Sequence, residues 1–211
     1  MQTNFIKTLC FQTVSLLFIA AVCLPHVVLS QPKKPGSIEY LKACNGYKGI
    51  FLGADIGTLP PGNLMYLDGN SRLDTDSCFR FEFKDENLLK LPDGNKLDLI
   101  AIRTYNNKII NIYLFFKRND GYAILSNFLS SFGLFTNRPN DYVDVYNWNT
   151  SKISLSLRYQ LKTSPGIAIF SCKPLEQEIA LKKVIRARKE KEMKEELERK
   201  KEFEILSAQN F

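Results

Sequence analysis

The acid–base chemistry available to this chain is limited by a single histidine, His26. Histidine is the most frequent proton carrier in enzymes, because its ordinary pKa lies close to neutral pH. His26 closely follows an apolar run over residues 8–24, and such a run near an N-terminus is typical of a secretory signal peptide. We therefore expect the mature protein to contain no histidine and no catalytic triad that depends on an imidazole.

Residues 1–30 have further features of a leader that is removed. Val28 and Ser30 lie at the two positions that a signal peptidase reads, which predicts cleavage between Ser30 and Gln31. An uncleaved anchor is less favoured, because a membrane-spanning helix needs about 20 apolar residues and this run is shorter. Lipidation of Cys23 is also less favoured, because the preceding residues fit a lipoprotein signal poorly. The mature protein is expected to be secreted or periplasmic and to have no membrane span.

Cleavage removes two of the five cysteines and leaves three (5 − 2 = 3), namely Cys44, Cys78 and Cys172. An exported protein can form disulfides, and three thiols allow three different pairings. We favour a Cys44–Cys172 bridge, because the two ends of a compact domain commonly lie close together. Three unbridged structural cysteines are the alternative. A catalytic thiol is not expected, since no histidine remains to activate it.

Carboxylate pairs can hydrolyse glycosides without histidine. The candidates, all near predicted turns, are Asp55, Asp68, Glu82 and Asp85. A short acidic group that could offer oxygen ligands to a cation consists of Asp68, Asn70, Asp74 and Asp76. Arg72 interrupts this group and no distal glutamate completes a calcium loop, so an ordinary solvated turn is favoured. Neither a metal nor another cofactor is expected.

Alternating and β-rich runs predict a sheet. The predicted strands cover residues 48–52, 78–84, 97–105, 108–117, 142–148, 152–161 and 167–172. Asn106-Asn107 favours a tight hairpin, because asparagine tolerates positive φ. A helix is expected to begin at a cap on Asn119 or Asp120, to end at Phe132 and to lay an apolar stripe on the sheet.

This order predicts an α+β domain over residues 46–173, in which an antiparallel sheet of two hairpins plus flanking strands packs against one helix. The expected core residues are Phe79, Phe81, Leu99, Ile112, Leu114, Phe128, Phe132 and Leu155. Residues 31–45 are predicted to be a flexible N-terminal tether. Residues 59–72, which contain glycine and a proline pair, are predicted to be loop and turns.

Pro174 suits the first turn of a long helix, predicted over residues 174–207. The apolar residues expected to dock its first half on the domain are Leu175, Ile179, Leu181, Val184 and Ile185. Beyond Arg186 opposite charges recur at i,i+4, and each such pair stabilises a helix by about 0.2–0.5 kcal/mol. We expect an isolated charged helix. A coiled coil is the alternative, although Met193 and Leu197 alone do not make a heptad seam.

Tyr142, Tyr146 and Trp148 alternate along a predicted strand, and Tyr and Trp are frequent interface anchors. They are a possible exposed interface, although burial in the core is the favoured interpretation. The net charge is +7 and becomes +6 when Lys7 is removed with the leader. Basic and acidic residues are interspersed, so nucleic-acid binding is not expected.

The order of hairpin, helix ending in Phe132-Gly133 and second hairpin with Trp148 resembles small exported bacterial proteins of unassigned function. The resemblance covers residues 46–172 and implies a signal peptide followed by one α+β domain. The plan is also similar, more distantly, to small envelope lipoproteins that assist outer-membrane assembly and to secreted β-lactamase-inhibitor folds. Neither resemblance implies a functional residue.

These patterns favour an exported, non-enzymatic interaction or envelope-maintenance protein with an unknown protein partner. Its globular domain would recognise the partner, and the charged helix would act as a spacer or docking arm. A carboxylate-dependent extracytoplasmic hydrolase is the first alternative, and it predicts a deep pocket with two facing acids. A secreted binding domain of the enzyme-inhibitor type is the second alternative.

Overall fold

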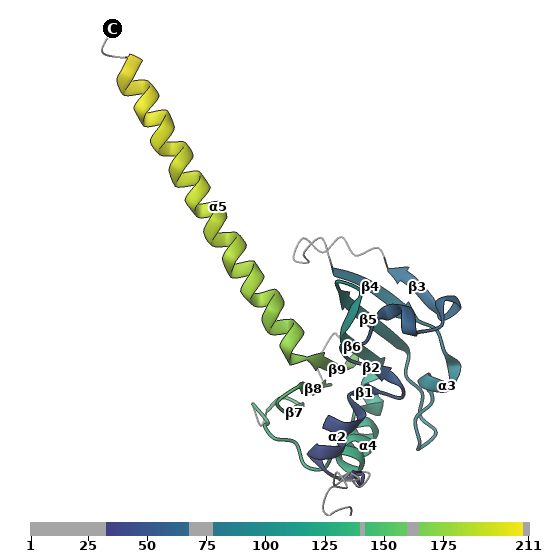
Figure 1. The fold of residues 1–211 in the computed structure, drawn as a ribbon. Coiled ribbons are helices and arrows are strands. Elements are labelled where there is room, and N and C mark those ends of the chain that lie inside the picture. The colour runs from purple at the N-terminus through teal and green to yellow at the C-terminus, as the bar shows by residue number, and fades with distance from the viewer. Residues whose placement is uncertain (1–32, 68–77, 140–141, 160–164, 209–211) are drawn as a thin grey trace, which may run out of the picture. The chain divides into compact units, whose positions relative to one another are not determined.

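The computed structural model describes residues 33–67, 78–139, 142–159 and 165–208. The predicted signal peptide and its cleavage site lie outside the described residues, and so does the acidic group from Asp68 to Asp76. The described chain forms a seven-stranded sheet, a two-stranded hairpin and several helices, including a long C-terminal one (Figure 1). The prediction of an antiparallel α+β fold is confirmed.

The large sheet has the order β3–β4–β5–β6–β9–β8–β7, and all neighbouring strands are antiparallel. The strands of both sheets are β1 (Gly46–Tyr47), β2 (Ile50–Phe51), β3 (Leu64–Leu67), β4 (Cys78–Phe83), β5 (Leu99–Tyr105), β6 (Lys108–Phe116), β7 (Val145–Asn149), β8 (Ile153–Arg158) and β9 (Gly166–Cys172). Strand β3 lies where the sequence predicted only loop and turns. It has four residues and pairs with β4 alone, so it shows too little alternation to be recognised.

Two-residue turns with left-handed backbone close two of the hairpins. Asn106 and Asn107 have φ values of 47° and 62° between β5 and β6, as predicted. Lys48 and Gly49, with φ values of 44° and 88°, form a similar turn between β1 and β2. Residues 48–52 were predicted to form a single strand, whereas Lys48 and Gly49 form the turn and only Ile50 and Phe51 are in β2. Lysine seldom adopts positive φ, so the turn carried no recognisable signal.

Helix α4 (Gly121–Phe132) covers one face of the large sheet, as predicted. Its buried side chains are those of Ile124, Leu125, Phe128 and Phe132. Gly133 ends the helix with a φ of 74°, also as predicted. Asp120 occupies the N-cap position, but its side chain makes no capping hydrogen bond.

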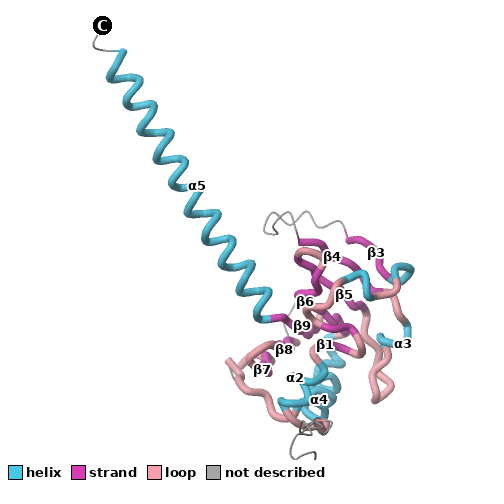
Figure 2. The backbone as a smooth tube through the Cα atoms, in the orientation of Figure 1, coloured by secondary structure: helices cyan, strands magenta, loops and turns pink. Residues whose placement is uncertain are grey.

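A second helix, α2 (Ile38–Cys44), lies beside α4 (Figure 2). The Ser37 hydroxyl accepts a hydrogen bond from the Tyr40 amide at its start, and Leu41 is fully buried. The Gly36 amide donates to the Ser131 carbonyl at 2.8 Å, which ties the segment to the end of α4. The stretch predicted to be a tether therefore contains a packed helix. It has only seven residues, too few for a clear apolar period.

The core lies between the large sheet and the layer formed by α2, α4 and the β1–β2 hairpin. Of the predicted core residues, those that are buried are Ile112, Leu114, Phe128, Phe132 and Leu155. Phe81 and Leu99 are half-buried. Phe79 is 38% exposed and contacts Tyr66 of β3, so its assignment to the core was wrong. Phe79, Phe81 and Phe83 share one face of β4, but only Phe83 joins the buried cluster, at 3% exposure.

The other face of the sheet receives the start of α5 (Lys173–Ala208). Ile179 is buried against Tyr105 and Ile110, and Leu175 packs beside them. The buried Asn111 amide donates to the Ser171 hydroxyl at 2.8 Å and to the Glu176 carboxylate at 2.9 Å.

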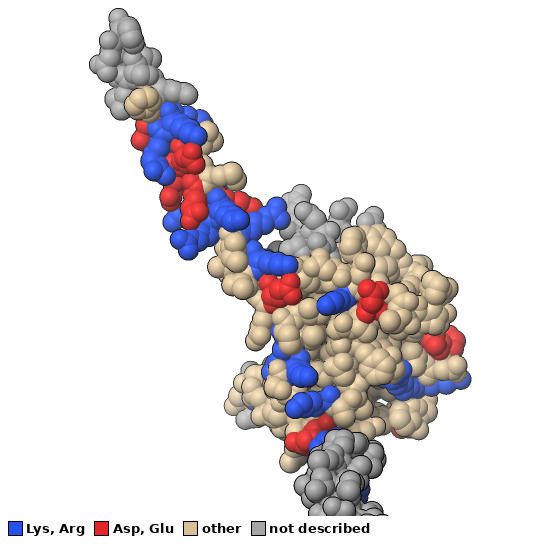
Figure 3. Space-filling model, in the orientation of Figure 1, with Lys and Arg blue, Asp and Glu red and all other residues tan. Residues whose placement is uncertain are grey.

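Leu181, Val184 and Ile185 were predicted to dock with Leu175 and Ile179, but they are 61%, 67% and 46% exposed. At 100° per residue, Leu181 and Val184 lie on the side of the helix away from Leu175 and Ile179, and Ile185 lies about 100° round from them, so none of the three packs on the sheet. Figure 3 shows basic and acidic side chains intermixed along α5. None of the described helices is both long and apolar enough to cross a membrane.

The remaining short elements are connectors. Helix α3 (Glu86–Leu89) follows β4, and single 3-10 turns cover Ile56–Thr58, Pro61–Asn63 and Arg118–Asp120. Asp93, in the turn that precedes β5, accepts a hydrogen bond from the Asn127 amide of α4 at 2.8 Å. This bond holds the segment before β5 against α4.

Candidate functional site

The aromatic residues of β7 do not form an exposed interface. Trp148 is fully buried, and its indole N–H donates to the Gly133 carbonyl at 2.8 Å. Tyr146 is 7% exposed, and its ring lies 5.1 Å from that of Phe135. Tyr142 alone is open to solvent, at 97% exposure. The favoured interpretation, burial in the core, is confirmed for Tyr146 and Trp148, so Tyr142, Tyr146 and Trp148 do not form one exposed patch.

The structure contains no Cys44–Cys172 bridge, and both residues are half-buried free thiols. Cys44 ends α2 and hydrogen-bonds Tyr40, which raises the pKa of the Tyr40 phenol. Cys172 ends β9 and packs against the main core. Cys78 lies on the other side of the sheet, where it packs against the cluster around Ile179.

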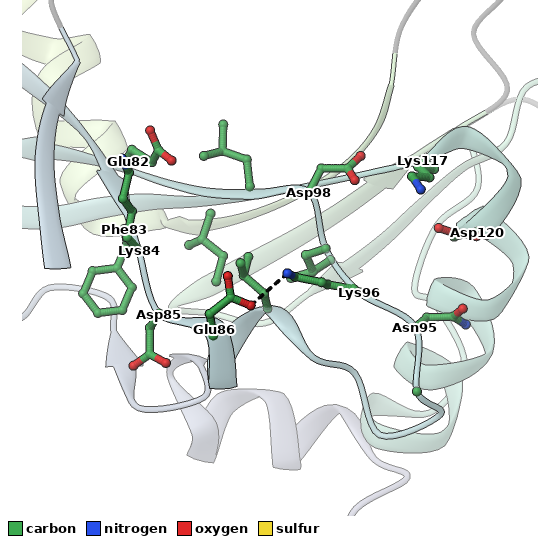
Figure 4. A pocket seen from close by; sticks show the side chains of 15 residues that line it. Glu82, Phe83, Lys84, Asp85, Glu86, Asn95, Lys96, Asp98, Lys117 and Asp120 are labelled. Carbon is green, nitrogen blue, oxygen red and sulfur yellow. Dashed lines mark hydrogen bonds and ion pairs between the residues drawn. The ribbon is translucent and has the colours of Figure 1, made fainter.

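A cleft of about 690 Å³ gathers charged side chains around the end of β4 (Figure 4). Two of the candidate carboxylates, Glu82 and Asp85, line it. Asp55 does not line this cleft. It caps the 3-10 turn that follows it by accepting a hydrogen bond from the Gly57 amide at 2.8 Å. Asp68 lies outside the described residues.

The cleft is a mixed-charge surface. Its lining includes three lysines among five acids, namely Glu82, Asp85, Glu86, Asp98 and Asp120. Glu86 and Lys96 form an ion pair at 2.8 Å, and Lys96 holds the pKa of Glu86 below its usual range. The side chains of Glu82 and Asp85 point in different directions (Figure 4). This geometry does not favour two carboxylates acting on one glycosidic bond, which requires the acids to face each other.

A smaller hollow of about 330 Å³, which we call the aromatic groove, lies between α2, the β1–β2 hairpin and α4. Its aromatic side chains are those of Tyr40, Tyr47, Phe51, Phe128 and Phe132. Leu91, Pro92 and Cys44 add further apolar surface. Concave, mostly apolar sites of about 300–1,000 Å³ are typical of small-molecule binding.

The elements around the groove fix its aromatic walls. Phe128 and Phe132 lie one helical turn apart on α4, with ring centroids 5.7 Å apart. Tyr47 on β1 is buried, which raises the pKa of its phenol, and its hydroxyl donates to the Leu88 carbonyl at 3.0 Å. Phe51 on β2 is 50% exposed and forms part of the open side. The groove thus has two rigid walls and one accessible aromatic ring.

Lys48 is the one cation among the groove's lining residues. Its ammonium donates a hydrogen bond to the Lys90 carbonyl and lies 5.6 Å from the centroid of the Tyr47 ring. Partial burial lowers the pKa of this ammonium. Within the part of the chain that the structure describes, no carboxylate forms an ion pair with Lys48.

Metal binding finds no support in the described residues, which contain no group of three or more His, Cys, Asp or Glu side chains able to hold an ion. The aromatic groove was not predicted from the sequence. Its lining comes from three separate segments, and one of them, α2, was taken for a tether. The positive φ at Lys48 was not predicted either.

No known protein family, curated protein or solved structure matches this chain.

Proposed function

We propose that this chain is an exported, non-enzymatic interaction protein whose α+β domain recognises its partner through the aromatic groove. Export is supported by the leader pattern of residues 1–30. The observation that carries the recognition role is the groove itself, a hollow of about 330 Å³ walled by aromatic side chains and open at Phe51. An envelope-maintenance role is compatible with the same site. In this proposal α5 serves as a spacer or docking arm.

A carboxylate-dependent hydrolase is the second candidate function. It is favoured by one observation, that Glu82 and Asp85 line the same cleft. Against it, the two side chains diverge, and three lysines interrupt the acids around them. A binding role requires no such pair, because shape and apolar contact already provide recognition. The binding function is therefore preferred.

The proposal can be tested on protein recovered from the extracytoplasmic fraction of its source cells. Native mass spectrometry of the wild type should show a bound species, protein or small molecule, beyond the mass of the chain. Phe51→Ala removes an exposed groove side chain and should lose that species while the fold is kept. Tyr66→Ala is the matched control, because Tyr66 is a similarly exposed aromatic residue, at 55%, and does not line the groove.

Three results would contradict the proposal. The first is repeated recovery of the wild type without any bound species. The second is a bound species retained equally by Phe51→Ala. The third is glycoside hydrolysis that disappears in Glu82→Gln or Asp85→Asn, which would favour the hydrolase. Intact mass of the same sample also tests cleavage between Ser30 and Gln31, since a chain that begins at Met1 would mean an anchored protein.

A further inference from the structure

We propose that the aromatic groove binds a small aromatic anion, a flat molecule of one or two rings whose acidic group pairs with Lys48. This inference rests on the proposed function and narrows the partner to a chemical class. It follows from the size of the groove, from its aromatic lining, and from the position and backbone conformation of Lys48.

The size of the groove favours a small molecule. Its volume of about 330 Å³ lies at the lower end of the range for ligand sites. A stable protein–protein interface buries about 1,200–2,000 Å² of surface, so a protein partner would have to contact much of the molecule outside this hollow. The groove can therefore accept one ring system, and a larger partner would need surface elsewhere on the molecule.

The lining favours an aromatic ring over an aliphatic chain. Phe128 and Phe132 stand on one wall, and Tyr47 and Phe51 lie on the facing hairpin. Aromatic rings prefer offset-stacked or edge-to-face contacts with centroids about 4.5–7 Å apart, and the rings within this core already adopt such contacts. A flat ring bound in the groove could make contacts of the same kind with the rings that line it.

Lys48 provides the charge that selects an anion. An ammonium has three N–H donors, and the structure uses one of them for the Lys90 carbonyl. No carboxylate of the described chain forms an ion pair with it, so a bound anion would supply its counter-ion. A carboxylate or sulfonate on a bound ring could accept the remaining donors.

The backbone at Lys48 supports a positional role. Two-residue turns of this kind strongly favour Asn, Asp or Gly where φ is positive, yet a lysine with a φ of 44° stands at this position. Strained residues of this type concentrate at binding sites, because the surrounding structure holds them there for a purpose other than stability. Here the turn places a cation at the groove.

The probe for the test is naphthalene-2-sulfonate, a flat two-ring anion whose binding is measured by titration calorimetry. Its neutral relative, naphthalene-2-sulfonamide, has the same ring system without the charge. Lys48→Asn removes the charge with a residue that tolerates the turn, and Lys48→Arg keeps the charge. Phe51→Ala removes the exposed aromatic ring from the groove lining. Tyr66→Ala again serves as the control outside the groove.

We expect one anionic probe to bind per chain. Lys48→Asn should weaken it about tenfold, as the loss of one charge-assisted hydrogen bond does, and Lys48→Arg should restore most of the affinity. The neutral probe should bind Lys48→Asn and wild type alike. Phe51→Ala should weaken both probes, and Tyr66→Ala should weaken neither. Thermal melting of each variant checks that the fold is retained.

The inference is overturned if the anionic probe does not bind, or if it binds Lys48→Asn as tightly as wild type. It is also overturned if Tyr66→Ala weakens binding as much as Phe51→Ala does. The proposed function fails by a different measurement, namely the absence of any groove-dependent bound species from the wild type in native mass spectrometry. A groove-dependent species combined with indifference to Lys48 would keep the function and reject the aromatic anion.

Discussion

In the α+β domain, Trp148, Phe116 and Phe170 are fully buried, whereas every residue of α5 from 180 to 203 is exposed. The domain is stabilised mainly by removing apolar surface from water. The outer part of α5 has little apolar surface to bury and is instead lined with i,i+4 ion pairs, such as Arg188–Glu192 at 2.9 Å. Since packing and exposed ion pairs differ widely in strength, the two regions should respond very differently to mutation and to salt.

The largest effect is expected in the domain core. Phe128 is 5% exposed and contacts Trp148, Phe132 and Phe170. Phe128→Ala should lower the free energy of unfolding by about 3–5 kcal/mol, because it removes buried area and leaves a cavity. Chemical denaturation followed by tryptophan fluorescence measures this change.

Phe79→Ala is the matched control, since it makes the same chemical change at a residue that is 38% exposed. It should cost clearly less, about 1–2 kcal/mol, because less area returns to water. Equal losses of stability in the two variants would mean that Phe79 is buried as deeply as Phe128, contrary to the structure.

The next effect is expected where the two regions meet. Asn111→Ala removes the donor that serves both Ser171 and Glu176 and leaves buried polar groups without it. The free energy of unfolding should fall by about 1–3 kcal/mol. Asn127→Ala removes an exposed side-chain hydrogen bond to Asp93, and its free energy of unfolding should stay within about 0.5 kcal/mol of the wild-type value. Equal effects would show that Asn111 has no special role at the base of α5.

A smaller effect is expected from removing the outer helix. A chain that ends at Arg186 should melt within about 2 °C of the full chain, because the deleted residues bury almost no apolar area. Scanning calorimetry of both chains measures the difference. A fall of about ten degrees, several times the shift that 1 kcal/mol produces in a protein of this size, would mean that the outer helix packs on the domain.

The smallest effect concerns the ion pairs themselves. A peptide of residues 186–204 should be partly helical by circular dichroism at low ionic strength and less helical in 1 M salt. Each exposed pair contributes only about 0.2–0.5 kcal/mol, and the Debye length falls from about 10 Å at 0.1 M to about 3 Å at 1 M. Helix content that does not change with salt would assign the helix to residue propensity alone.

The parts of the fold that were predictable from the sequence are those with strong local chemistry. Asn106-Asn107 demanded a tight turn, and the apolar stripe ending at Phe132-Gly133 demanded a helix that stops there. Both are present. The exposure of the outer part of α5 was also predictable, because this segment has many charged residues and few apolar side chains to bury. The opposite charges expected to pair at i,i+4 do so, for example in Lys191–Glu195 at 3.7 Å and Glu196–Lys200 at 2.8 Å.

The candidate site was not predictable, because nothing local encodes it. The aromatic groove exists only when α2, the β1–β2 hairpin and α4 meet, and residues as distant as Tyr40 and Phe132 share it. Tyr146 and Trp148 illustrate the opposite error. Their alternation along the strand is the same whether that face meets solvent or the core, and only the packing of α4 and Phe135 decides between them.

The bond from Asn111 to Glu176 has a mechanical consequence. Helix α5 has 36 residues, and at 1.5 Å per residue it is about 54 Å long. A tilt of about 10° at its first turn would therefore carry the far end through about 9 Å. Glu176 lies in that first turn and is held at 2.9 Å by one amide of the sheet. This hydrogen bond acts together with the packing of Leu175 and Ile179 and with the Lys182–Tyr105 hydrogen bond to hold the first turns of α5, and any small change of angle at these contacts is magnified along the helix.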